Sequence, residues 1–126
     1  MVDIESLRIL SVAQARGPEA DLKLFRASGV QFPTEVWYLA DLGYQGLQEA
    51  HAYTSLPVKK PKDRPLTADE KHQNRCLAKL RIRVEHVIRR LKVFRILSER
   101  YRNRRKRFGL RVRLIAGLYN FELASA

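Results

Sequence analysis

The chain has 126 residues, 45% of them hydrophobic, which is enough for one domain with a core and excludes a disordered tail. One cysteine and three histidines exclude a disulfide framework and a zinc cluster. No apolar run is long enough to span a membrane, and the first residues lack the pattern of a signal peptide.

Net charge is the most informative property of the composition, at +12 for the whole chain. Residues 1–58 carry four Lys/Arg against seven Asp/Glu, a net −3, whereas residues 59–126 carry 21 against six, a net +15. The basic residues alternate with apolar ones and do not form a tail. This asymmetry favours a polyanionic partner, most often nucleic acid.

The first 58 residues predict short elements of both kinds. Hydrophobic and β-branched runs predict strands at 7–12 and 35–40 and a short one at 56–58, and helical patterns cover 20–28 and 48–53. Gly43 and Gly46 directly follow the second strand and predict a tight turn there.

The remaining residues read as a basic loop and two long helices. Thr67 and Glu70 have the spacing of a capping box, and a helical pattern of about thirty residues follows. Its apolar stripe comprises Leu77, Leu80, Val84, Val87 or Ile88, and Leu91. After a basic connector at 101–107, a last helix has the stripe Leu110, Leu114, Ile115, Leu118 and Phe121.

Asp41 is the first candidate for chemistry. It lies at the C-terminal end of the predicted strand at 35–40, before the glycine turn. Open α/β sheets often place functional groups at this position. The alternative is an aspartate that only starts the turn.

Glu85 is the second candidate, because it is the only acidic residue between Glu70 and Glu99, in a stretch with nine Lys/Arg. Helical spacing puts it on one face with Arg81, Ile88 and Lys92. One interpretation is an ion-pair partner on a solvated face, worth a few tenths of a kcal/mol. The other is a metal-binding carboxylate, with the surrounding cations there to bind phosphates.

Taken together, these patterns resemble a known family. The segments concerned are 39–46, 56–61, 70–75, 81–88, 91–102 and 115–120. Their joint pattern is similar to the catalytic-domain end of bacterial insertion-sequence transposases of the DDE superfamily, the group akin to Harbinger elements. The resemblance covers almost the whole chain.

The family's third catalytic carboxylate belongs to a signature of Tyr, two residues, Arg, three residues, Glu, six residues and Lys. Arg81, Glu85 and Lys92 match it, whereas Ala78 replaces the Tyr. Asp41 matches the family's second catalytic Asp. The resemblance therefore implies that Asp41 and Glu85 are catalytic and bind a divalent cation, Mg²⁺ or Mn²⁺.

Asp21 matches another recurring family motif, in which a His usually precedes the Asp and which here has Ala20. We rank Asp21 below Asp41 as a site residue, because it falls at a predicted helix start.

The resemblance also implies the fold, an α/β, incomplete ribonuclease-H-like domain with mixed sheet strands followed by a long helix and a C-terminal helix. We expect a single partial catalytic domain over 1–126, strand-rich and acidic over 1–58 and basic and helical over 59–126. The first catalytic strand and the N-terminal DNA-binding region are expected to be absent. The chain is then either a truncated remnant or the second reading frame of a split transposase, inactive alone.

The implied partners are DNA at transposon ends and an upstream transposase half that supplies the first Asp. The chain is expected to be cytoplasmic, bacterial and nucleoid-associated, and an unpaired sheet edge leaves room for self-association. The residues expected to contact DNA are Arg81, Arg89, Arg90, Lys92, Arg102, Arg104, Arg105 and Lys106.

Two other interpretations stay open on the sequence alone. One is a non-enzymatic basic nucleic-acid-binding module in which Glu85 is structural. The other is an RNA-binding or ribosome-associated protein, against which the basic half's lack of a base-stacking aromatic pattern argues.

Overall fold

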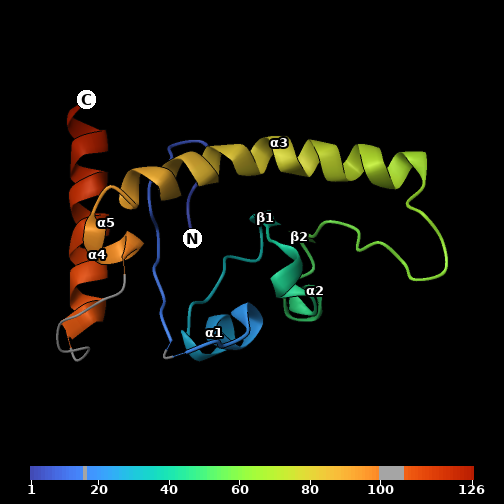
Figure 1. Cartoon of the computed structure of the whole chain (residues 1–126), viewed down its shortest axis with the longest axis horizontal. Coiled ribbons are helices and arrows are strands. Elements are labelled where there is room, and N and C mark those ends of the chain that lie inside the picture. The colour runs from blue at the N-terminus through green and yellow to red at the C-terminus, as the bar shows by residue number, and fades with distance from the viewer. Residues whose placement is uncertain (16, 100–106) are drawn as a thin grey trace. The chain divides into compact units, whose positions relative to one another are not determined.

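The computed structural model describes residues 1–15, 17–99 and 107–126 (Figure 1). It divides into two compact units. We call residues 15–81 the central unit, and residues 1–14 with 82–126 the terminal unit. In chain order the elements are α1 (Asp21–Ala27), β1 (Tyr38–Leu39), η1 (Leu42–Tyr44), α2 (Leu47–Ala50), β2 (Thr54–Ser55), α3 (Ala68–Leu91), α4 (Arg95–Ser98) and α5 (Phe108–Ser125). The described part is thus a mixed, helix-rich α/β structure. None of its helices is long and apolar enough to cross a membrane.

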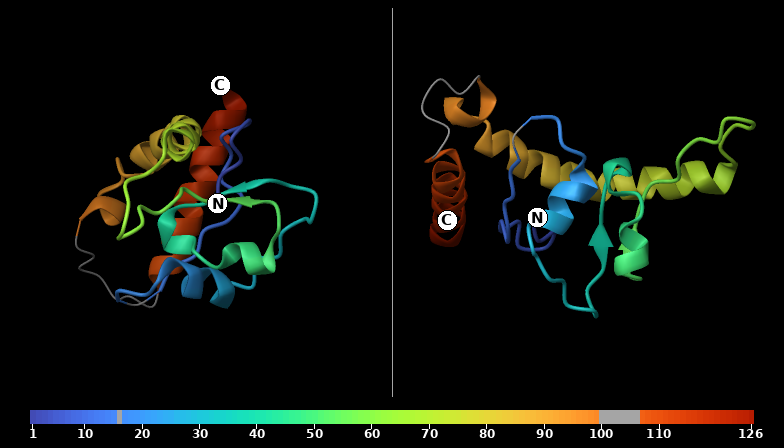
Figure 2. Two further views of the ribbon diagram at one scale, coloured as in Figure 1. Left: turned by 90° about the vertical axis from the view of Figure 1, so that its right-hand side faces the viewer. Right: turned by 90° about the horizontal axis from the view of Figure 1, so that it is seen from below.

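The central unit contains a small parallel sheet made of β1 and β2, whose arrows lie side by side in Figure 2. Tyr38 faces Thr54 and Leu39 faces Ser55. The strand predicted at 35–40 is confirmed only over its residues 38–39. The strand expected at 56–58 is wrong, and β2 lies just before it, at Thr54–Ser55. It ends before Pro57, which has no N–H to donate to a ladder.

Aromatic rings pack the central unit below this sheet. The Phe32 ring stacks on Phe25 with centroids 4.8 Å apart and lies 3.7 Å from the Tyr38 centroid. His51 is buried edge-on against the Tyr38 ring, and its Nε2 lies 3.2 Å from the carbonyl oxygen of Pro33. Ring packing therefore joins β1 to the segment between α1 and the sheet.

The core of the terminal unit is small and comes from three segments far apart in the chain. Ile9, Val87, Ala116 and Tyr119 are buried together, and Val87 is only 1% exposed. The Tyr119 hydroxyl donates to the carbonyl oxygen of Leu7 at 3.2 Å. The N-terminal segment is thereby fixed to α5.

The strand expected at 7–12 is wrong. This segment has a single isolated antiparallel bridge, between Val2 and Ile9, and Leu7 has a positive φ of 59°. The backbone of Ile9 instead bonds to the side chain of Asn120, 111 residues away. A side-chain partner replaces the neighbouring strand that the β-forming residues led us to expect.

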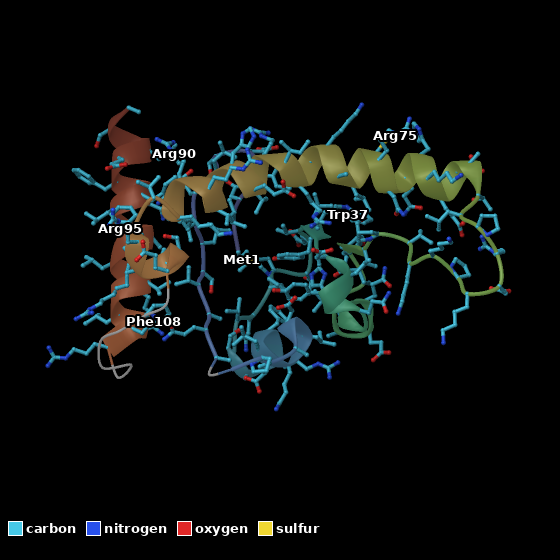
Figure 3. The ribbon with its side chains drawn as sticks, viewed as in Figure 1. Met1, Trp37, Arg75, Arg90, Arg95 and Phe108 are labelled. Carbon is cyan, nitrogen blue, oxygen red and sulfur yellow. The ribbon has the colours of Figure 1, made fainter. Side chains whose placement is uncertain are left out.

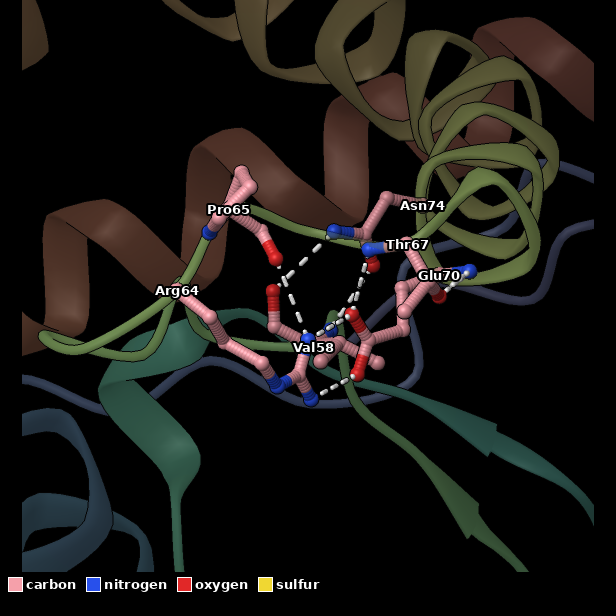
Figure 4. A network of polar contacts seen from close by, with 6 residues as sticks. All are labelled: Val58, Arg64, Pro65, Thr67, Glu70 and Asn74. Atoms are coloured by element: carbon pink, nitrogen blue, oxygen red, sulfur yellow. Dashed lines mark hydrogen bonds and ion pairs between the residues drawn. The ribbon is translucent and has the colours of Figure 1, made fainter.

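Two asparagines hold extended backbone by the same device, which we call an amide clamp. Asn120 accepts from the Ile9 N–H at 2.8 Å and donates to the Ile9 carbonyl at 2.8 Å. Asn74 does the same to Val58, at 2.7 Å and 3.0 Å (Figure 4). Each clamp supplies both hydrogen bonds that a β-ladder would give one residue.

The predicted capping box at the start of α3 is confirmed (Figure 4). The Thr67 N–H donates to Glu70 Oε2 at 2.8 Å, and the Glu70 N–H donates to Thr67 Oγ1 at 3.2 Å. Arg64 adds two further bonds of 2.8 Å to the Glu70 carboxylate. The predicted long helix then runs without interruption to Leu91.

The predicted apolar stripe of α3 is only partly right. Leu77, Val84 and Leu91 are half-buried, as expected, but Leu80 is exposed. Of the two alternatives Val87 and Ile88, Val87 is the buried one.

The last predicted helix is confirmed as α5, but of the predicted apolar stripe only Ile115 is buried. Ile115, Ala116 and Tyr119 are buried. The other members of the predicted stripe are exposed, namely Leu110, Leu114, Leu118 and Phe121. Asn120 and Tyr119 both bond to the N-terminal segment, so these polar contacts select the buried face.

We expect Asn74→Asp to lower the free energy of unfolding by about 1–3 kcal/mol, the cost of unpaired part-buried polar groups. The change removes the donor and sets a negative oxygen against the Val58 carbonyl. Urea unfolding measures the loss, and amide exchange of Val58 should accelerate. Gln73→Ala, at the exposed preceding position, should change stability by less than about 0.5 kcal/mol. Equal effects of the two substitutions would contradict the clamp.

Glu70 predicts a pH dependence of stability. The hydrogen bonds from Arg64 and from the Thr67 N–H lower the pKa of Glu70 from 4.5 to about 2. A lowered folded-state pKa adds stability above pH 4.5, which is lost as the pH falls toward 2. Glu70→Gln keeps an oxygen for the Thr67 N–H but removes the titrating charge. Urea midpoints between these two pH values should therefore fall less steeply in this variant, and Glu35→Gln, at another exposed carboxylate, should retain the original slope.

Candidate metal centre at the Asp41 turn

Asp41 lies where the sheet ends. The Ala40 N–H donates to the Ser55 carbonyl at 3.1 Å, which is the last bond of the ladder, and Asp41 follows at once. Its Oδ1 accepts from the Leu42 N–H at 2.7 Å and caps η1. Asp41 therefore follows a strand and starts a turn. This position fits both interpretations from the sequence, a functional carboxylate at a strand end and an aspartate that only starts the turn.

The two glycines of this turn are required for different reasons. Gly46 has a φ of 93°, a left-handed conformation that a side chain rarely adopts. A Cβ on Gly43 would collide with the carboxylate of Asp21 at the start of α1. The Asp21 side chain thus lies directly against the turn that carries Asp41, a contact that the spacing of the two residues in the sequence did not indicate.

Tyr44 lies in the electrostatic field of both aspartates. Burial raises the pKa of its phenol, and the negative charges of Asp21 and Asp41 raise it further. In the sequence, the only indication that Asp21 belongs to the site was its match to a motif of the family that the chain resembles.

Arg81 of α3 pairs with Asp41 through both prongs of its guanidinium. Nη2 donates to Oδ2 at 2.8 Å and Nη1 donates to Oδ1 at 3.2 Å. The Arg81 side chain is 34% exposed and that of Asp41 52%. Their pairing places a signature residue of the long helix on the strand-end carboxylate within the central unit.

Glu85 and Lys92, the other signature residues, are exposed. Glu85 is one helical turn after Arg81 on α3 and belongs to the terminal unit. Within the described residues it forms no ion pair, so Arg81 is bound by Asp41 and not by its own helix neighbour. The approach of Glu85 to Asp41 stays a prediction.

The residues expected to contact DNA have different surroundings. Arg89 is exposed, and the Arg90 guanidinium lies 5.5 Å from the centre of the Tyr119 ring. Arg102, Arg104, Arg105 and Lys106 lie outside the described residues.

The donor set at the turn suits a hard divalent cation. Carboxylate oxygens are the ligands that Mg²⁺ and Mn²⁺ prefer, and Mg²⁺ is often held by only one or two carboxylates with phosphate oxygens. The Asp41 carboxylate offers such oxygens at the turn, and whether Glu85 joins it stays a prediction. Among the described residues, no group of three or more His, Cys, Asp and Glu side chains could hold a metal ion.

Comparison with known proteins gives a family in keeping with these features, namely the carboxylate at the strand end and the basic helix with its acidic signature residue. Residues 3–120 match the family model described as DDE superfamily endonuclease, and the chain belongs to this family. It is 50% identical over 117 residues to the probable transposase for insertion sequence element IS702 of Microchaete diplosiphon. The match covers 93% of this chain and 42% of that relative, so the chain spans less than half its length. No solved structure matches.

Gly43→Ala tests the close approach of Asp21. Alone it should lower the unfolding free energy by about 0.5–1.5 kcal/mol, because the Asp21 side chain must leave its rotamer. With Asp21→Ala already in place, the same change should raise stability by about 0.4–1 kcal/mol by restricting the unfolded chain. Thermal unfolding of the unchanged chain, the two single variants and the double variant measures the effect of Gly43→Ala with and without the Asp21 side chain. If Gly43→Ala changes stability in the same direction in both backgrounds, the contact is ruled out.

Proposed function

We propose that this chain supplies two metal-binding carboxylates, Asp41 and Glu85, and a DNA-binding basic surface to a DDE transposase that cuts and rejoins DNA strands. The family assignment supports a transposase-like activity. Endonucleases of this superfamily generally depend on divalent metal ions.

The observation that carries the proposal is the bond between Arg81 and Asp41. Asp41 ends a sheet strand, and Arg81 belongs to the same helix as Glu85, one turn before it. The helix that bears the second carboxylate is thus joined to the first carboxylate through its own signature arginine.

The role of the basic half in DNA binding rests on charge. Residues 71–98 contain nine Lys/Arg and only one acidic residue, Glu85. Most of these cations are exposed, including Arg89 on α3 and Lys92, which directly follows α3. A surface that neutralises phosphates loses affinity as salt rises, with a slope of about 0.9 per phosphate contacted. We propose that Arg102, Arg104, Arg105 and Lys106 contribute to the same surface.

A pair of divalent ions, when bound, activates the nucleophile and stabilises the leaving oxygen in phosphodiester chemistry. Asp41 and Glu85 would hold such ions with their carboxylate oxygens, and the exposed cations would orient the DNA backbone. We propose that another part of the transposase supplies the remaining carboxylate and completes a ribonuclease-H-like domain. The parallel pairing of β1 and β2 and the strand-end position of Asp41 are consistent with that fold.

Removal of either carboxylate should take away most of the affinity for the metal. We expect Asp41→Asn and Glu85→Gln each to weaken Mn²⁺ binding by about tenfold or more, as for other losses at metal sites. Isothermal titration with Mn²⁺ measures this on the 126-residue chain. Glu49→Gln, a matched loss of an exposed carboxylate on α2, should leave Mn²⁺ binding unchanged.

Affinity for a short DNA duplex, measured by fluorescence anisotropy, should be unchanged or improved in both site variants, because neither loses a cation. Retained Mn²⁺ binding in Glu85→Gln would instead favour the non-enzymatic module in which Glu85 is structural.

A further inference from the structure

Both oxygens of the Asp41 carboxylate accept hydrogen bonds in the structure. Oδ1 accepts from the Leu42 N–H at 2.7 Å and from Arg81 Nη1 at 3.2 Å, and Oδ2 accepts from Arg81 Nη2 at 2.8 Å. A cation that binds Asp41 needs these same oxygens. The guanidinium also holds a positive charge beside both oxygens, which opposes the approach of a cation.

Arg81 is suited to a contact that forms and breaks. An arginine does not lose its proton at physiological pH, so only a competitor for the carboxylate or for the guanidinium can release it. Its two-pronged geometry fits a phosphate as well as a carboxylate. The pair is partly exposed to solvent, so exchange needs no opening of a buried core.

We propose that Arg81 is a displaceable guard of Asp41. Without DNA and metal it neutralises the carboxylate and opposes cation binding; when DNA binds, its guanidinium moves to a backbone phosphate and frees Asp41. Metal and DNA binding are then coupled through one side chain, and each strengthens the other by the same factor. This inference rests on the proposed function, since it assumes that Asp41 is a metal ligand.

The first test compares Mn²⁺ affinity without DNA. Arg81→Gln should bind Mn²⁺ about two- to fivefold more tightly than the unchanged chain, the range expected from loss of a surface ion pair. Arg75→Gln is the matched control, because Arg75 is an exposed cation on α3 in the same unit (Figure 3). It should leave Mn²⁺ affinity within error of the unchanged chain.

Arg81→Lys gives a second test that does not rely on the neutral variant folding. Lysine keeps the charge but loses the two-pronged bond, so its Mn²⁺ affinity should lie between those of the unchanged chain and Arg81→Gln. If both Arg81 variants bind Mn²⁺ as tightly as the unchanged chain or more weakly, the role proposed for Arg81 is wrong.

Coupling distinguishes this role from a merely structural one. The ratio of duplex affinities with and without Mn²⁺ should be larger for the unchanged chain and for Arg75→Gln than for Arg81→Gln. Equal ratios in all three proteins would overturn the proposal. Asp41→Asn distinguishes failure of the metal site from failure of the role proposed for Arg81. If this variant retains Mn²⁺ binding, the metal site itself is wrong. If it loses Mn²⁺ binding but Arg81→Gln binds Mn²⁺ with unchanged affinity, only the role of Arg81 is refuted.

Discussion

Each buried peptide group of an extended segment needs a hydrogen-bonding partner, and this chain has little sheet to provide one. The strands β1 and β2 are two residues long. Two extended segments instead have side-chain partners on the long helices: Asn74 on α3 holds Val58, and Asn120 on α5 holds Ile9. The helices thus provide apolar surface and also the donor and acceptor groups that a neighbouring strand would otherwise provide. The side-chain amides of these helices determine where the two extended segments lie.

Local features of the fold could be predicted because their causes are local. The start of α3 follows from Thr67 and Glu70, three positions apart, which satisfy each other's backbone N–H groups. The buried faces of the helices could not be predicted in the same way. Leu80 and Val87 are equally plausible by periodicity, but only Val87 meets the N-terminal segment and α5 in the core. Hydrophobic spacing defines a candidate face, and packing against distant residues determines which part of that face is buried.

The candidate site shows the same division. A strand followed by two glycines located Asp41 at the end of β1, since a strand end and its turn are adjacent in sequence. The pairing with Arg81 spans 40 residues and the contact of Asp21 with Gly43 joins separate elements, so neither has a local signal. The wrong strand at 7–12 has the same cause, because the partner of Ile9 is a side chain 111 positions away.

The amide clamps recognise only peptide groups. Val58 contributes its N–H and its carbonyl to Asn74, and no atom of its side chain takes part in those bonds. Evolution can therefore vary the residue at position 58 freely with respect to the clamp, with proline excluded because it has no N–H. Position 74 has no such latitude, since an amide is the side chain of this length that offers one donor and one acceptor side by side. The constraint on an extended segment is thus transferred to one helical residue distant in the chain.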